Sequence, residues 1–301
     1  MTPSATGLLP TLPDPRGGWV GRSFGHSGFS GDTAGANVRI RMRRLEPGGE
    51  VTSWRTATDT VLFHHGGVPL TVVLSDPSGA PTRVVLGQPT PSAHVPQLVV
   101  TAGTEHSITA DPGSADALWT EVEVPTDAPA ETDPMTTVVG CFDRLQDRLL
   151  LTSHPEGGYY RQTYQSGGLV STPRGQRYVA NSIFYLLDQR SPIGHLHSNT
   201  SDITHFIHGP GPIRYRMLAP DGTLHEQDLG TDVDAGQVPV MTCPAGWWKS
   251  SEVAEVTGEG LISELVAPGF DFADQAMITP DDLAERFPHH VLALTKYVWA
   301  G

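Results

Sequence analysis

Lysine is nearly absent from this sequence, and so are cysteine and long apolar runs. The chain has 301 residues and a formal net charge of −14, and only Lys249 and Lys296 are lysines among its 19 basic residues. An acidic surface repels the phosphates of nucleic acids and of anionic lipids. No segment reaches the roughly 18 consecutive apolar residues that cross a bilayer. We therefore expect a small-molecule substrate as the partner, with no nucleic acid and no membrane.

Only two cysteines, Cys141 and Cys243, are present, and they lie far apart. The sequence does not open with a cationic segment followed by an apolar one, which is the pattern of a secretory signal. These features argue against a disulfide framework and favour a reducing compartment. We expect a cytoplasmic protein.

Glycine and proline are abundant, with 33 and 26 residues, and they divide the sequence into short segments. Many of them recur at an offset of 143 residues, which is the distance from Phe63 to Phe206. One matched block comprises Asp59, Phe63, His65, Gly66 and Pro69, which recur as Asp202, Phe206, His208, Gly209 and Pro212. Glycine and proline in register reflect particular turns rather than general composition. The sequence therefore predicts two copies of one domain.

Each copy is predicted to be a closed antiparallel β-barrel, so the expected fold class is all-β with a few short helices. Short β-rich runs at 182–187, 213–218 and 261–266 alternate with turn signals. A helix is expected at 137–150, and another is expected to begin at Thr279, with Pro280 at its first position. We place the first domain at 1–125, an exposed linker at 126–136, and the second domain at 137–301.

Four histidines fall within the segment GHLHSNTSDITHFIHG, residues 194–209. On a strand, His195 and His197 share a face because side chains two residues apart point the same way. A turn through 198–201 would bring Asp202 back toward them on the next strand. Two imidazoles and a carboxylate suit Fe, Mn, Ni or Zn and leave coordination positions open for substrate. We therefore predict a divalent metal site made of His195, His197 and Asp202.

The spacing HxHx4Dx6G, which ends on Gly209, resembles the first motif of the cupin superfamily, with aspartate in place of the usual glutamate. The segments 154–161, 201–206, 238–248 and 267–274 resemble signatures of the DUF985 or cupin-5 family, and the likeness extends over residues 137–290. The resemblance implies a jelly-roll barrel with an internal pocket, dimeric association, and similarity to sugar-nucleotide epimerases and germin-like proteins. The chain thus resembles a bicupin, with two tandem jelly-roll barrels.

Lys249 stands where the second cupin motif usually supplies a fourth metal ligand, a histidine. A protonated lysine does not bind a metal, so three uses remain open for this residue. It could anchor a substrate carboxylate, it could act as a general base if burial lowers its pKa, or it could face the solvent.

The first copy departs further from the pattern. Thr52 and Trp54 stand where the second copy has its two clustered histidines, although Asp59 is kept, and His106 matches Lys249. We expect the first barrel to be a degenerate, structural half that has lost the metal, with a residual ligand-binding role as the alternative.

Several further residues of the second copy are candidates for proton transfer or for substrate contact. Asp202 and His197 form a proton-transfer pair even without a metal, with Tyr159 or Tyr185 as the acid. His208 is in phase with Asp202 and is expected to line the pocket, whereas His205 is out of phase and is expected to face away. Phe206 and Trp248 are candidate substrate contacts, and the alternative for both is a place in the barrel core.

The predicted function is a metal-dependent enzyme that acts on a small oxygenated substrate by proton transfer, as an isomerase, epimerase or dehydratase, with Lys249 or a tyrosine moving protons. The alternatives are an Fe(II) oxygenase, which would use the same ligand set, and a non-catalytic small-molecule binding protein. The chain is expected to be a monomer with pseudo-dimeric halves or a homodimer.

Overall fold

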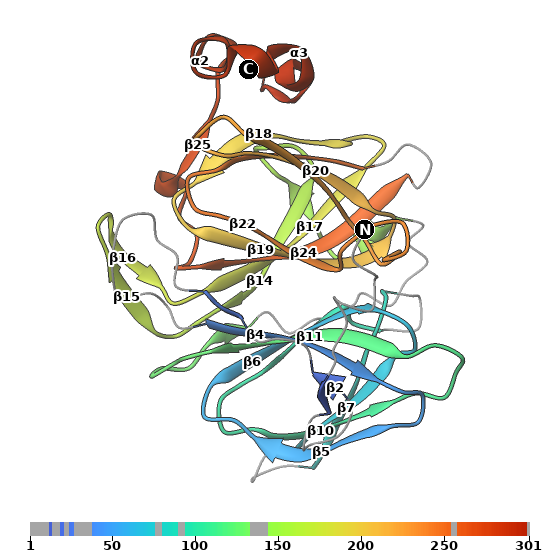
Figure 1. Cartoon of the computed structure of the whole chain (residues 1–301). Helices are drawn as coiled ribbons and strands as arrows, with labels where there is room; N and C mark the ends of the chain where they lie inside the picture. The colour runs from blue at the N-terminus through green and yellow to red at the C-terminus, as the bar shows by residue number, and fades with distance from the viewer. Residues whose placement is uncertain are drawn as a thin grey trace.

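A computed structural model defines residues 38–75, 80–89, 94–132, 144–253 and 258–299, together with the backbone of three short strands before residue 27. In Figure 1 two β-barrels lie one above the other, the first coloured blue to green and the second yellow-green to red. Each barrel consists of two antiparallel sheets that face each other. This arrangement confirms the predicted all-β class with two tandem barrels.

The first barrel combines a seven-stranded sheet with a four-stranded sheet. The larger sheet has the order β1-β2-β4-β11-β6-β9, with β3 beside β4, and the smaller has the order β5-β10-β7-β8. The bounds are β1 (Leu12–Pro13), β2 (Trp19–Val20), β3 (Phe24–His26), β4 (Val38–Leu45), β5 (Glu50–Arg55), β6 (Asp59–Gly66), β7 (Leu70–Ser75), β8 (Thr82–Leu86), β9 (Gln97–Val100), β10 (Glu105–Ala110) and β11 (Ala117–Val124).

The second barrel combines a seven-stranded sheet, β12-β14-β17-β24-β19-β22 with β13 beside β14, and a five-stranded sheet, β21-β20-β23-β18-β25. A separate two-stranded hairpin, β15-β16, projects from its side (Figure 1). The bounds are β12 (Glu131–Thr132), β13 (Thr152–Ser153), β14 (Tyr159–Gln165), β15 (Leu169–Thr172), β16 (Gly175–Tyr178), β17 (Asn181–Asp188), β18 (Ile193–Asn199), β19 (Asp202–Pro210), β20 (Ile213–Leu218), β21 (Leu224–Leu229), β22 (Val240–Cys243), β23 (Trp248–Val253), β24 (Glu259–Ala267) and β25 (Gln275–Met277).

The two barrels repeat one strand plan. Strand β6 pairs with β11 in the first barrel, and β19 pairs with β24 in the second. The isolated bridges Leu86–Val95 and Leu229–Val238 occupy matching positions. The predicted strands at 182–187, 213–218 and 261–266 lie within β17, β20 and β24. The duplication inferred from glycine and proline therefore holds in the structure.

Helices are few and short, as predicted: α1 (Leu145–Arg148), η2 (Phe272–Asp274), α2 (Pro280–Arg286), η3 (Pro288–His290), α3 (Val291–Leu294) and η4 (Thr295–Tyr297). Helix α2 begins at Pro280, and the Thr279 side chain accepts a hydrogen bond from the backbone N–H of Asp282. The described end of the predicted 137–150 helix is the single turn α1, while 137–143 lie outside the described residues. Among the described residues, no helix has the length and apolar character that a membrane span requires.

The segment predicted as a linker, 126–136, contains β12, which pairs with β14 at the edge of the second barrel. Residues 133–136 lie outside the described residues. The described part of this connection is therefore partly a strand rather than a free tether.

The barrels meet through their large sheets at a shared apolar cluster. Phe63 and Phe206, which match each other in the repeat, stack with ring centroids 4.1 Å apart and planes inclined by 4°. Val61 and Val122 from one barrel and Leu265 from the other belong to the same buried cluster. Because the residues on both sides come from matching strands, the interface has an approximate two-fold symmetry.

Two matching histidines cross this interface. His65 Nδ1 lies 2.9 Å from the carbonyl oxygen of Ile207, and His208 Nδ1 lies 2.7 Å from that of His64. A carbonyl oxygen only accepts, so each Nδ1 carries the proton and each Nε2 is an acceptor. His208 Nε2 lies 2.8 Å from Ser263 Oγ, and His65 Nε2 lies 2.7 Å from the matching threonine hydroxyl. Burial keeps both imidazoles in the neutral form.

Acid is expected to weaken this interface. Burial lowers the pKa of His65 and of His208 to about 3, whereas the ordinary pKa of histidine is about 6.5. The unfolded chain therefore binds more protons than the folded chain between pH 6.5 and pH 3, so these two groups reduce stability as the pH falls through that window and have no such effect above it. At pH 5 the loss relative to pH 7 should be about 2 kcal/mol per histidine.

Urea denaturation at pH 7 and pH 5 measures this loss. The control is the double variant His65→Gln/His208→Gln, because glutamine offers a donor and an acceptor but does not titrate. The drop between the two pH values should be smaller in this variant by about 4 kcal/mol. An equal drop in both proteins would show that the two histidines do not govern the acid response.

Candidate functional site

The second barrel holds a cavity of about 570 Å³. Its inner wall includes His197 and Asn199 of β18, Tyr185 of β17, Glu264 of β24, and Glu156 of the turn before β14. Its lining continues outward to the β15-β16 hairpin and to η2. Sites for small molecules usually have volumes of about 300–1,000 Å³, so this cavity has a suitable size.

A glycine turn places Glu156 against β18. Gly157 has a φ of +95°, and a Cβ added to it would lie 2.2 Å from the carbonyl oxygen of Ile193. Only glycine accommodates this combination of backbone angle and close approach. The turn therefore packs tightly on β18, and Glu156 Oε2 comes within 3.2 Å of His197 Nε2.

The hydrogen bonds assign the protons of this pair, which we call the Glu156–His197 dyad. His197 Nδ1 lies 2.7 Å from the carbonyl oxygen of His195, so Nδ1 donates and Nε2 is left as an acceptor. Burial raises the pKa of Glu156 to about 8. Burial, together with the charge of Lys249, holds the pKa of His197 well below its usual range. At neutral pH Glu156 is thus a carboxylic acid that donates to a neutral imidazole.

A second buried cluster lies beside the dyad. Lys249 Nζ is 3.2 Å from Glu264 Oε1 and 3.0 Å from His205 Nε2. Burial opposes ionisation of both Lys249 and Glu264, but their mutual attraction outweighs it, so the pKa of the lysine is raised and that of the glutamate falls well below its usual range. Both remain charged, and Lys249 places a fixed positive charge next to Glu156.

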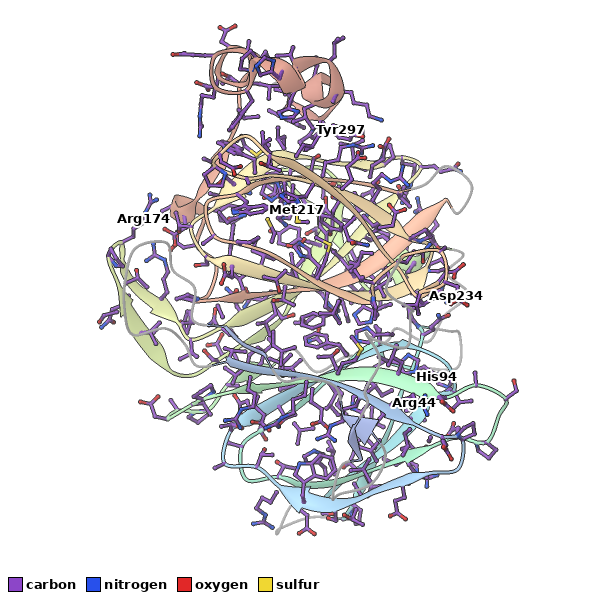
Figure 2. The ribbon with its side chains drawn as sticks, in the orientation of Figure 1. Arg44, His94, Arg174, Met217, Asp234 and Tyr297 are labelled. Atoms are coloured by element: carbon purple, nitrogen blue, oxygen red, sulfur yellow. The ribbon has the colours of Figure 1, made fainter. Side chains whose placement is uncertain are left out.

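The predicted triad of His195, His197 and Asp202 does not converge in the structure. His197 lines the cavity, but His195 Nδ1 lies 3.2 Å from the carbonyl oxygen of Tyr297, and its ring meets Trp299 with centroids 5.0 Å apart. The cause is a register shift in β18 between Gly194 and His197, which ends the simple alternation of faces. Figure 2 shows Tyr297 under the C-terminal helices, at the outer end of the barrel.

Asp202 instead holds a loop in place. Its Oδ1 accepts a hydrogen bond of 2.7 Å from the backbone N–H of Ala245, and Asp59 makes the matching bond of 2.9 Å to Ala102 in the first barrel. The repetition of this bond in both copies explains why the aspartate is present in each. The predicted catalytic role of Asp202 is therefore replaced by a structural one.

The phase predicted for β19 was also wrong. His205 and Ile207 point into the barrel, where His205 meets Lys249, while Phe206 and His208 point to the first barrel. The prediction took Asp202 as an inward residue, but this aspartate bonds to a loop at the start of the strand. Phe206 and His208 are thus interface residues and not substrate contacts.

The two candidate tyrosines and Trp248 also lie in other settings than predicted. Tyr185 lines the cavity, but its hydroxyl donates to the carbonyl oxygen of Gly157 at 2.9 Å, so it supports the glycine turn. Tyr159 packs on the cluster around α1, with the guanidinium of Arg190 5.1 Å from its ring centroid. Trp248 packs with the C-terminal helices.

Two segments of the sequence, residues 42–127 and 143–278, match the family described as Cupin superfamily (DUF985). The chain belongs to this family. Because the two matched segments fall on the two barrels, both halves of this DUF985 chain are cupin domains.

Similar proteins agree with this assignment. A Saccharomyces cerevisiae protein described as uncharacterized is 32% identical over 163 residues, which make up 50% of this chain and 81% of the yeast protein. The oxalate decarboxylase of Lactobacillus farciminis, solved as a formate complex, has a TM-score of 0.51 and 10% identity and covers 96% of this chain and 94% of its own. Vicilin of Corylus avellana has a TM-score of 0.51 and 10% identity, with 97% and 96% covered. At such low identity these two structures show a common fold and nothing more.

Cupin folds often bind metals, but the donor groups of this DUF985 chain do not fit one. Among the described residues, no three histidine, cysteine, aspartate or glutamate side chains are arranged to hold an ion. His154 Nδ1 lies 3.8 Å from Glu156 Oε2 but accepts a hydrogen bond from the backbone N–H of Glu156, and Glu264 and His205 are directed at the ammonium of Lys249. Its raised pKa also contradicts the idea of Lys249 as a general base. Lys249 is therefore protonated and places a positive charge inside the second barrel.

The described residues of the first barrel form no matching site. The ring of His106 packs on Trp54 with centroids 4.0 Å apart, and burial lowers the pKa of His106 to about 4. Glu121, which matches Glu264, pairs with Arg43 through a distance of 2.7 Å, and both side chains are buried. The barrel interior is filled by a large apolar cluster that includes Trp119. The described interior of the first barrel is therefore mainly apolar.

The sequence analysis did not name Glu156 or Glu264 as site residues, although a signal was available for Glu264. Glu264 lies inside the apolar run LISELVA, and its match Glu121 recurs in the other copy. A carboxylate in a buried strand requires a partner, so Glu121 and Glu264 each indicated a cation inside its barrel. Glu156 offered no such signal, because only the three-dimensional turn brings it to His197.

Proposed function

We propose that the second barrel is a proton-transfer enzyme of the isomerase or epimerase type that works through the Glu156–His197 dyad without a metal ligand set. The observation that carries this proposal is the 3.2 Å contact between Glu156 Oε2 and His197 Nε2 in the wall of the cavity, where burial raises the pKa of Glu156 to about 8. An acid or base whose pKa lies near the working pH transfers protons most effectively.

The chemistry follows from the assigned protons. Near pH 8 part of the Glu156 population loses its proton to solvent, and the resulting carboxylate can accept a proton from a carbon next to a carbonyl group, while His197 holds the glutamate in position. The substrate then carries negative charge on its carbonyl oxygen, and the ammonium of Lys249 favours that charge. Return of the proton to carbon, on either face or at the neighbouring carbon, gives epimerisation or isomerisation.

The test is exchange of substrate C–H protons with solvent. The full chain, treated with EDTA and dialysed, is incubated in D₂O with hydroxyaldehydes and hydroxyketones from glyceraldehyde to the hexoses, and loss of the α-proton signal is followed by ¹H NMR. We expect catalysed exchange for at least one compound, at the same rate with and without EDTA. Absence of exchange for every compound, or exchange that requires added metal, would contradict the proposal.

A further inference from the structure

The outer part of the cavity differs from the dyad because most of its polar groups are amides, with aromatic rings beside them, and its carboxylate Asp271 accepts a hydrogen bond from the backbone N–H of Ala273. Gln162, Gln176 and Asn199 line it. Tyr178 and Phe272 stand at its rim with 38% and 57% of their surface exposed. Exposed aromatic rings beside amide groups suit a ligand that has both apolar C–H faces and hydroxyl groups.

The cations near the cavity are already paired. Arg177 is the one arginine or lysine among the described lining residues, and its Nε and Nη2 donate to the two carboxylate oxygens of Asp274 at 2.6 and 3.0 Å. Lys249 is paired with Glu264. Figure 2 shows Arg174, next to Arg177 on the same hairpin, extending toward η2, and it also pairs with Asp274. An anionic ligand would therefore find no uncompensated cation among these groups.

One buried polar group in this region lacks a partner. The side chain of Asn199 is 6% exposed, it lines the cavity, and its Oδ1 accepts no hydrogen bond from the described residues. A buried acceptor without a donor is energetically unfavourable, and a bound ligand with a hydroxyl group would supply the missing donor. Asn199 lies two residues after His197 on β18. A ligand hydroxyl group that donates to Asn199 would therefore lie near the dyad.

We infer that the cavity takes an uncharged polyhydroxylated compound, of the sugar or polyol class, and that Asn199 is a specificity-determining residue that accepts a hydrogen bond from one of its hydroxyl groups. The inference rests on the proposed function and names its class of substrate. The aromatic rings of the rim cover the C–H face of the ligand, and the amides take its hydroxyl groups.

Isothermal titration calorimetry on the full chain tests this inference with matched probes. The neutral probes are D-glucose, D-galactose, D-mannose, L-rhamnose and myo-inositol, and the anionic probes are glucuronate and glucose 6-phosphate. We expect at least one neutral probe to bind, and both anionic probes to bind at least about tenfold more weakly, which corresponds to about 1.4 kcal/mol. Stronger binding of an anionic probe would overturn the inference. So would no neutral binding up to roughly 10 mM, which is ten times the usual upper end of KM values.

Variants locate the contact. Asn199→Leu should weaken binding of the neutral probe about tenfold, since one hydrogen bond is lost. The control is Gln189→Leu, which removes an exposed amide outside the cavity lining and should change nothing. Equal affinities for the two variants would overturn the role of Asn199. If Asn199→Leu does not fold, the preference of the native chain for neutral over anionic probes still decides the ligand class.

Failure of this inference and failure of the proposed function are distinguishable. Calorimetry needs no chemistry, and Glu156→Gln should still bind the neutral probe within a few-fold. Neutral binding without proton exchange would leave the ligand class standing and would remove the enzyme proposal. Proton exchange confined to anionic compounds would support the enzyme proposal and would overturn the inferred ligand class.

Discussion

Glu156→Gln is expected to lower the rate of substrate C–H exchange by about 10²–10⁴-fold while leaving the fold intact. The folded protein holds Glu156 as a neutral acid that donates to His197, because burial raises its pKa to about 8. A glutamine amide has nearly the same shape and also donates to His197 Nε2, but it cannot give up its proton. The substitution therefore removes proton transfer and keeps the hydrogen bond. ¹H NMR exchange rates and thermal melting of the two proteins measure both parts.

A matched control is Glu285→Gln, the same chemical change on the exposed face of α2, which should leave exchange unaffected. His197→Gln should reduce exchange as strongly as Glu156→Gln. The double variant should be no slower than either single variant, since residues that act as a unit are not additive. Additive losses in the double variant would indicate two independent groups rather than a dyad.

Lys249→Met is expected to destabilise the fold by about 3–5 kcal/mol, because it leaves the carboxylate of Glu264 buried without its cation. The lysine side chain is 4% exposed and the glutamate 11% exposed, so water provides little compensation for either. Urea denaturation at pH 7 measures the loss. The double variant Lys249→Met/Glu264→Gln removes the unpaired charge as well and should recover most of the stability.

The chain supplies the matched control in its second lysine. Lys296 pairs with Glu252 at 2.8 Å, but its side chain is 57% exposed. Exposed ion pairs contribute about 0–1 kcal/mol, so Lys296→Met should cost little. Similar losses for the two lysines would contradict the view that Lys249 is a structural and electrostatic centre of the second barrel.

The fold was predictable because the duplication is recorded in residues that particular turns require. Gly103 and Gly246 match in the repeat and have φ values of +82° and +78°, and Asp59 and Asp202, which hold the matching loops, also correspond. The interface was only partly predictable. Phe206 matches Phe63, but the repeat alone does not say that the two rings stack on each other.

The site was less accessible to sequence reasoning, for two physical reasons. A register shift in β18 turns His195 toward Tyr297, and no residue pattern in the segment marks that shift. The phase of β19 was anchored on Asp202, so the inward and outward faces were exchanged for His205 and His208. An error of one residue in phase exchanges every side chain on a strand.

His197 lines the cavity and Lys249 is buried beside Glu264 of its wall, but the structure gives both residues other roles than those predicted. His197 serves the dyad rather than a metal site, because its Nε2 faces Glu156. Lys249 acts through its charge and not as a base, because Glu264 raises its pKa against the effect of burial. These roles depend on which groups lie nearby in space, which strand periodicity alone does not determine.

The protonation state of Glu156 is the claim on which the proposed chemistry depends. A ¹³C NMR titration of the glutamate side-chain carboxyl groups, with the Glu156 signal assigned by its absence in Glu156→Gln, measures it directly. The Glu156 carboxyl should titrate with a midpoint near pH 8. A midpoint near the ordinary glutamate value of about 4.3 would show a carboxylate at neutral pH and would contradict the account.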